Sequence, residues 1–225
     1  NRRLNELFYI ETLGMKPLLE ESAFLSLGDQ SGIEKMVLEE SPSMRSRKVE
    51  GTKKLARLIV KVENPSEIEA LLARMDKIPQ LYKGTKGYAF EVLSPEGDLV
   101  LIHAEDDIKD LKKVDETVTF SKDEKLQYLT AFEISVEINL PEETTSLLEK
   151  EEIENGLAFK QAQGSDLLIE NNVTWDLSML KFQVQTLDLA NLRQRFETVG
   201  YFVPKSEKFF LTKDTNNIEL WFEEV

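Results

Sequence analysis

The chain has 225 residues and a net charge of −14, so it is long enough for two domains of ordinary size. Apolar residues make up 41%, and no apolar run approaches the roughly 18 residues of a membrane-spanning helix, which excludes such a helix. Cysteine is absent, which excludes disulfides, thiolate nucleophiles and Cys-ligated metal sites.

Charge is unevenly distributed along the chain. Residues 1–115 carry 18 basic and 21 acidic side chains, whereas residues 116–225 carry 10 and 21. Neither half has the basic excess that phosphate binding requires, so nucleic acid is not an expected partner. The acidic second half either favours a basic partner or keeps the protein soluble. The chain begins at Asn1. We therefore expect the native N-terminus to be missing, and a cytoplasmic location and export to the cell surface or medium both stay open.

The first half of the chain alternates helical and extended patterns. Gly14 is a natural stop for the first helix, and Asn64-Pro65 is a natural start for the second. The predicted elements are a helix at 1–15, a hairpin of strands at 16–27 and 35–39, a polar mobile loop at 41–54, a strand at 55–63, a helix from Asn64, and a closing hairpin at 88–105.

The second half repeats this order. Pro141 marks a helix start and Gly200 a helix stop. The predicted elements are a strand at 130–140, a helix at 142–154, a hairpin at 156–172, a strand at 177–185, a helix at 187–199, and final strands within 201–224.

Four hairpin segments share one pattern, which indicates an internal repeat. Each has an aromatic residue early in its first strand, a polar turn, and an apolar second strand that ends at an acid. The aromatic residues are Phe24, Phe90, Phe159 and Phe210, and the acids are Glu39, Glu105, Glu170 and Glu223. With the strand and helix ahead of it, each hairpin completes a β-α-β-β-β unit, and the first unit lacks its opening strand.

The charge-rich stretch in the middle of the chain has no core pattern, so it separates two pairs of units. We therefore predict an α+β fold of two domains, residues 1–115 and 126–225, joined by a linker region at 106–126.

Paired β-α-β-β-β units are the plan of the vicinal oxygen chelate superfamily, which includes glyoxalases and extradiol dioxygenases. The stretch NRRLNELFYIETLGMKPLLEESAFLSLGD resembles the opening helix and hairpin of that superfamily, and SPEGDLVLIH is similar to its closing turn. In the second domain TNNIELWFEE carries the resemblance. As a whole, the chain resembles the streptococcal complement C3-degrading proteinase family (CppA-like), which implies a glyoxalase-like domain at each end and cleavage of complement C3.

The resemblance also implies a metal site, and the first domain departs from it. Enzymes of the superfamily hold a divalent metal with His and Glu on inward-facing strand positions. Counted from Gly97, the position of the closing-strand Glu is Leu101, and the position of a family histidine is Arg57. A leucine cannot coordinate a metal and a guanidinium repels one, so no metal is expected here.

The second domain retains one ligand position. Glu219 matches the closing-strand Glu, whereas Ser135 and Met179 stand where the histidines would be. One carboxylate with a hydroxyl and a thioether is a poor set for a divalent metal. We expect Glu219 to pair with a neighbour such as Lys181, and we expect no cofactor in either domain.

His103 is the only histidine and the weak candidate for a catalytic base. On an alternating strand, Leu101, His103 and Glu105 point to one face, so His103 and Glu105 form the candidate pair. A lone histidine on a mixed face more often has a structural role. No G-x-S-x-G, H-E-x-x-H or Asp-Thr-Gly signature accompanies it.

Three functions follow from these observations. The residues favour a metal-free binding or interaction protein whose cavities hold a small ligand or whose surface contacts a protein. The family resemblance implies a peptidase that acts on host complement C3, and the superfamily implies a metal-dependent glyoxalase- or dioxygenase-type enzyme. The candidate ligand-binding positions are Arg57, Leu101, Ser135, Lys181 and Glu219.

Overall fold

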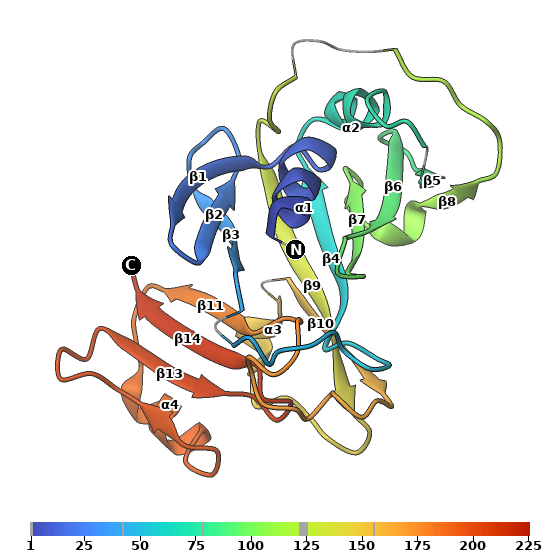
Figure 1. Cartoon of the computed structure of the whole chain (residues 1–225). Helices are drawn as coiled ribbons and strands as arrows, with labels where there is room; N and C mark the ends of the chain where they lie inside the picture. The colour runs from blue at the N-terminus through green and yellow to red at the C-terminus, as the bar shows by residue number, and fades with distance from the viewer. Residues whose placement is uncertain (1, 42, 78, 122–125, 155) are drawn as a thin grey trace. The chain divides into compact units, whose positions relative to one another are not determined.

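The computed structural model describes residues 2–41, 43–77, 79–121, 126–154 and 156–225. Contacts divide the chain into two compact units, and each is described by itself. Unit 1 comprises Asn1–Pro42 and Arg57–Val136, and unit 2 comprises Ser43–Ala56 and Glu137–Val225. Two long strands, β4 (Leu55–Val62) and β9 (Phe132–Pro141), pass from one unit to the other (Figure 1).

Unit 1 begins with a helical segment that ends at Gly14 and is followed by a three-stranded sheet. The helical turns α1 (Arg2–Leu7) and η1 (Phe8–Thr12) end before Gly14, which has a φ of +72°. A Cβ at Gly14 would lie 3.0 Å from a methyl of Leu71, so both backbone and packing favour glycine. The antiparallel sheet has the order β1-β2-β3, with bounds Lys16–Glu21, Phe24–Gly28 and Glu34–Glu39.

The expectation of one strand over residues 16–27 is wrong. Two strands form, because Ser22 adopts a left-handed φ of +49° and turns the chain between β1 and β2. The sequence gives no local sign of this turn, because the run Glu20-Glu21-Ser22 contains no Gly or Pro.

The second half of unit 1 is a β-α-β-β-β unit. The Asn64 side chain accepts a hydrogen bond from the backbone N–H of Ser66 at 3.2 Å and caps α2, whose first residue is Pro65. Strand β4 runs parallel to β7, and the remaining neighbours pair antiparallel in the order β4-β7-β6-β5-β8. The bounds are α2 Pro65–Leu72, β5 Gln80–Lys83, β6 Tyr88–Leu93, β7 Leu99–His103 and β8 Lys112–Val114.

Strand β8 and the short helix η2 (Ile108–Asp110) lie within the stretch that the sequence assigns to a linker. Strand β8 adds to the sheet beside β5, with Tyr82 opposite Lys113. On the other edge, β9 lies beside β4, and the backbone N–H of Glu63 donates to the carbonyl of Ala131 at 3.1 Å.

Unit 2 contains a second β-α-β-β-β unit with the same strand order. Strand β11 (Met179–Val184) runs parallel to β14 (Glu219–Glu224), and the order is β11-β14-β13-β12. Helix α4 (Leu189–Arg195) ends against one face, where Phe196 packs 6.0 Å from both Phe210 and Phe222. The remaining strands are β12 Tyr201–Phe202 and β13 Phe209–Lys213. The predicted repeat is confirmed for these two β-α-β-β-β motifs, which begin at β4 and at β11.

The other part of unit 2 differs from the predicted repeat. Only the first strand of the hairpin expected at 156–172 forms, as β10 (Leu157–Ala162), and residues 163–172 are turns and irregular chain. The helix expected at 142–154 is reduced to α3 (Lys150–Glu154) within the described residues. Both expectations are therefore wrong in extent.

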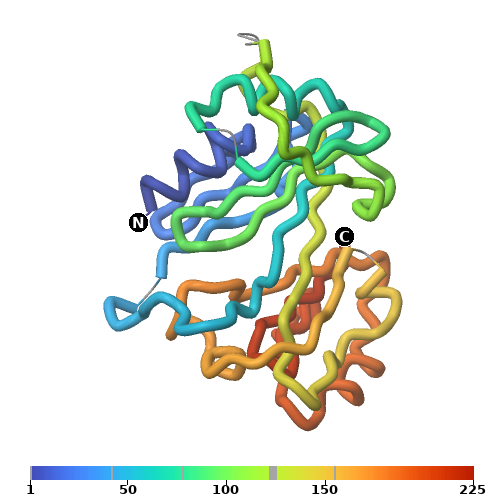
Figure 2. Tube along the Cα trace, turned by 90° about the vertical axis from the view of Figure 1, so that its right-hand side faces the viewer, coloured from blue at the N-terminus to red at the C-terminus, as the bar shows by residue number. Residues whose placement is uncertain are grey.

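Segment 43–56 is hydrogen-bonded to the irregular chain of unit 2. The backbone carbonyl of Arg47 accepts a hydrogen bond from the N–H of Trp175, and the backbone N–H of Arg47 donates to the carbonyl of Val173. The hydroxyl of Thr52 donates to the carbonyl of Gln163 at 2.7 Å. Figure 2 shows this light-blue segment beside the orange chain of unit 2. The expectation that the loop at 41–54 is mobile is wrong for 43–54, because these backbone groups are bonded to unit 2.

Candidate functional site

Three predicted site residues, Arg57, Leu101 and His103, lie on one face of the β4-β7-β6 sheet. In register, Ile59 is opposite Leu101, Lys61 is opposite His103, and Glu91 of β6 is opposite Leu101. Helix α2 covers the other face, since it lines a common pocket with Tyr88, which alternates onto that face with Phe90 and Val92. We call Arg57, Ile59, Lys61, Glu91, Leu101 and His103 the His103 face.

Leu101 lies at the centre of the His103 face and is only 2% exposed. On β4, the guanidinium of Arg57 is 3.6 Å from a carboxylate oxygen of Glu91. Burial, then the negative charge of Glu91, raises the pKa of Tyr82 on β5, which keeps its phenol protonated. A leucine and a cation with its own carboxylate leave no donor set for a divalent metal. Among the described residues, no group of three or more His, Asp and Glu side chains is placed to hold one.

His103 is sealed from solvent, with 3% of its surface exposed. Burial, followed by the charge of Lys61, lowers its pKa to about 4, while Glu105 opposes this shift. The imidazole is therefore neutral at neutral pH. Its Nδ1 atom has no hydrogen-bond partner among the described residues. A neutral imidazole has the protonation state of a general base, but a buried one does not reach a substrate.

Glu105, the other catalytic candidate, closes the turn between β5 and β6. It is 1% exposed, and its carboxylate accepts hydrogen bonds from the Thr85 hydroxyl at 2.6 Å and the Lys86 N–H at 2.7 Å. Burial would raise its pKa, but these bonds hold the pKa below its usual range. A Cβ at Gly84 would lie 2.4 Å from this carboxylate, so the turn is built around it. This geometry gives Glu105 a structural use.

In unit 2 the predicted residues lie on the sheet face opposite α4. Glu219 is in register with Met179 on one side and Lys213 on the other. The ammonium of Lys181, the partner expected for Glu219, instead lies 2.9 Å from the carboxylate of Glu223. Ser135 belongs to β9 in unit 1. A carboxylate between a thioether and a lysine does not suit a divalent cation.

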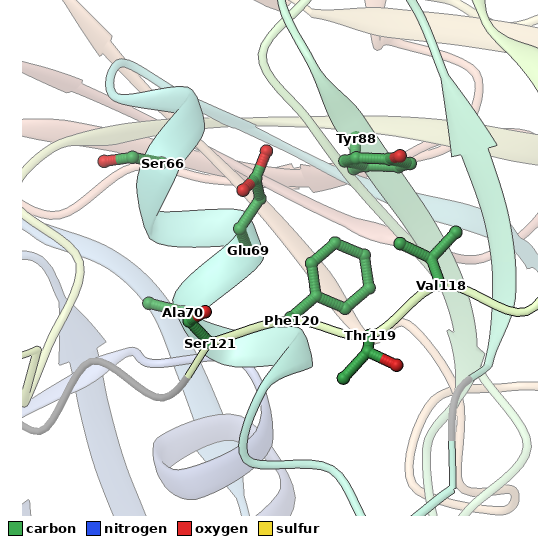
Figure 3. Close-up of a pocket in the computed structure, with 8 residues that line it drawn as sticks. All are labelled: Ser66, Glu69, Ala70, Tyr88, Val118, Thr119, Phe120 and Ser121. Atoms are coloured by element: carbon green, nitrogen blue, oxygen red, sulfur yellow. The ribbon is translucent and has the colours of Figure 1, made fainter.

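Two pockets open in unit 1, and neither is lined by a predicted site residue. The first has a volume of about 340 Å³ and lies between α2, β6 and the chain after β8 (Figure 3). The second, of about 240 Å³, shares Ser66 and Ala70 of α2 with the first. The first pocket, which we call the Phe120 pocket, is lined by Ser66, Glu69, Ala70, Tyr88, Val118, Thr119, Phe120 and Ser121.

The sequence did not predict the Phe120 pocket, because half of its lining residues belong to the predicted linker. Residues 118–121 belong to no helix or strand, and Phe120 is held by an edge-to-face contact with Tyr88, 5.1 Å between ring centres. The one available signal was an isolated aromatic residue in a charged stretch, which also fits a surface residue.

Comparison with known proteins agrees with this architecture. Family models described as CppA N-terminal and CppA C-terminal match residues 1–114 and 129–222. The crystal structure of the cppA protein from Streptococcus pneumoniae TIGR4 is 67% identical, with a TM-score of 0.96 over 100% of this chain and 94% of that one. A candidate dioxygenase from Bacillus subtilis strain 168 is 12% identical, with a TM-score of 0.54 over 98% of this chain and 80% of that one, and shows the fold alone. A search of curated proteins found no match. In the described residues, no helix is both long and apolar enough to cross a membrane.

Proposed function

We propose that this chain, which belongs to the CppA family, acts by binding a ligand or partner and not by cleaving one. The observation that carries the proposal is the burial of two residues on the His103 face. Leu101, at the position where the family resemblance implies a metal ligand, and His103, the candidate base, are almost fully buried. Neither side chain offers an exposed surface for a substrate to contact.

Peptide hydrolysis of the serine-peptidase type requires a nucleophile, a base and an orienting group around one substrate atom. The chain has no cysteine and a single histidine, and that histidine is buried with its pKa lowered to about 4. Glu105, its nearest carboxylate candidate, is already bonded to Thr85 and Lys86. These residues support a binding role more strongly than a peptidase role.

Metal-dependent chemistry of the glyoxalase or dioxygenase type is not supported by the donor set either. In unit 1 the ligand positions hold Leu101 and the Arg57–Glu91 pair. In unit 2, Glu219 has Met179 and Lys213 as its strand neighbours.

The Phe120 pocket is a concave surface that is open to solvent and suits a binding role. Its lining combines two aromatic rings, hydroxyl groups and one carboxylate.

The experiment that tests the proposal is a cleavage and binding assay with complement C3, the partner that the family resemblance suggests. Purified protein is incubated with C3 and with denatured casein, and fragments are resolved on gels, while a biosensor measures C3 binding. The expected result is no cleavage of either substrate. Cleavage by the wild-type protein that is lost in His103→Gln would overturn the proposal, and Lys205→Gln, an exposed change in unit 2, is the control.

A further inference from the structure

We infer that the Phe120 pocket binds an alkylammonium group, either of a free amine or of a lysine side chain on a partner protein. This inference rests on the proposed binding function and names the chemistry of its ligand. Glu69 on α2 lines the pocket together with the aromatic rings of Tyr88 and Phe120 (Figure 3). A carboxylate beside aromatic rings is a combination that stabilises an organic cation.

The charges around the pocket favour a cation. Of its eight lining residues, Glu69 alone is charged, and no residue in the described part of the chain forms an ion pair with it. The net charge of −14 adds a field of the same sign at long range. The Glu69 carboxylate repels an anion, and a neutral ligand would leave this carboxylate without a charged partner.

The two rings are not equivalent toward an incoming cation. The ammonium of Lys83 already lies 4.6 Å from the centre of the Tyr88 ring. A second cation is therefore placed over Phe120, close to Glu69 and away from Lys83. The hydroxyl groups of Thr119 and Ser121 border the same space and can accept the remaining N–H bonds. A volume of about 340 Å³ is enough for an ammonium group with a short alkyl chain.

Titrations of the full chain with three probes test this inference. The probes are n-butylammonium, an Nα-acetyl-lysine methylamide, and its Nε-acetyl derivative, which has no charge. Amide chemical shifts in two-dimensional NMR report binding, and we expect both cations to shift the signals of Ala70 and Tyr88. If the lysine derivative alone binds, the source is a protein side chain; if both bind, the ammonium group suffices. Equal binding of the uncharged derivative, or no binding by either cation, overturns the inference.

Variants distinguish the pocket from general attraction to an acidic protein. Glu69→Gln is expected to weaken binding at least tenfold and Phe120→Leu severalfold, whereas Glu197→Gln, an exposed carboxylate in unit 2, leaves it unchanged. Equal losses in Glu69→Gln and Glu197→Gln would overturn the inference. Because Lys122 follows Ser121 in the sequence, Lys122→Gln is titrated as well, and equal or tighter binding is expected.

The cleavage assay on the same preparation separates the two proposals. Absence of ammonium binding without cleavage of C3 refutes the ligand class alone. Cleavage that depends on His103 refutes the binding function itself. Circular dichroism of each variant confirms that a lost signal reflects binding and not unfolding.

Discussion

Arg47 and Asp166, 119 residues apart in sequence, form a two-point ion pair inside unit 2. The guanidinium donates to both carboxylate oxygens, at 2.7 and 2.8 Å, and the backbone N–H of Glu50 donates to the same carboxylate at 2.7 Å. These hydrogen bonds, chiefly those from Arg47, lower the pKa of Asp166 to about 2. The pair ties the connection between β3 and β4 to the irregular chain that follows β10.

Breaking this pair is expected to destabilise unit 2. Asp166 is buried beside the partly exposed Arg47 side chain, so Arg47→Met leaves its carboxylate without the cation that pairs with it. We expect Tm to fall by several degrees in Arg47→Met and in Asp166→Asn, measured by calorimetry at pH 7. Arg45→Met, an exposed arginine of the same segment, serves as the control and should leave Tm unchanged. Equal Tm values for the Arg47 and Arg45 variants would contradict this role.

A fragment of residues 129–225 is expected to fail to fold cooperatively, because segment 43–56 supplies part of its interior. Lys54 is 2% exposed, its ammonium donates to the carbonyl of Ile169 at 2.7 Å, and Asp176 accepts from its backbone N–H. Adding a peptide of residues 43–56 should produce or raise a thermal transition in a concentration-dependent way. A peptide with Arg47→Met and Lys54→Met is the control. A sharp transition in the fragment alone would show that the segment is dispensable.

The elements that the sequence predicted well are those with local causes. Asn64 and Pro65 fix the start of α2, and the apolar, β-forming run from Leu99 to Ile102 fixes β7, since cap chemistry and a short apolar run after a turn are visible within a few residues. Segment 43–56 lacks any such local cause. Its conformation depends on Asp166 and Asp176, which lie more than a hundred residues away.

The candidate site was likewise predictable only where local sequence determines it. Alternation placed Leu101, His103 and Glu105 on one face, and the register agrees for Leu101 and His103. Alternation does not reveal whether such a face is covered, so the burial of His103 had no sequence signal. The roles of Arg57, Ser135, Lys181 and Glu219 in ligand binding stay predictions. The Phe120 pocket depends on a contact between a strand and an irregular segment, which no periodicity encodes.

Unit 1 is expected to lose stability as the pH falls from 7 to 5, because of His103. Its pKa is about 4 in the folded chain and about 6.5 in the unfolded chain, so the unfolded state takes up the proton first. Stability is full above pH 6.5 and declines until the pH passes 4, by about 2 kcal/mol between pH 7 and 5. Lys61, Arg57 and Glu105 are the charged groups that act on the ring.

Urea unfolding at pH 7 and pH 5 measures this loss. His103 is the only histidine, so no other imidazole titrates in the same range. In His103→Gln the difference between the two pH values should shrink to a small remainder from carboxylates. A loss that is as large in His103→Gln as in the wild type would assign the pH dependence to other groups.

Leu101→Glu places a carboxylate at the position where the family resemblance implies a metal ligand, and we expect it to destabilise the chain without creating a metal site. Leu101 is 2% exposed, between Ile59 and Glu91, so the variant loses apolar packing and places a second carboxyl group beside the first. The expected cost is about 3–5 kcal/mol in the free energy of unfolding. Leu93→Glu, at a position 62% exposed on β6, should change the free energy of unfolding by less than about 0.5 kcal/mol.

Urea unfolding with and without ZnCl₂ or MnCl₂ measures both the loss of stability and any binding of metal. Arg57 lies two residues before Ile59 on β4 and repels a cation, so we expect added metal to leave the Leu101→Glu midpoint unchanged. A midpoint that rises with metal in Leu101→Glu but not in Leu93→Glu would show that the residues around position 101 can complete a metal site.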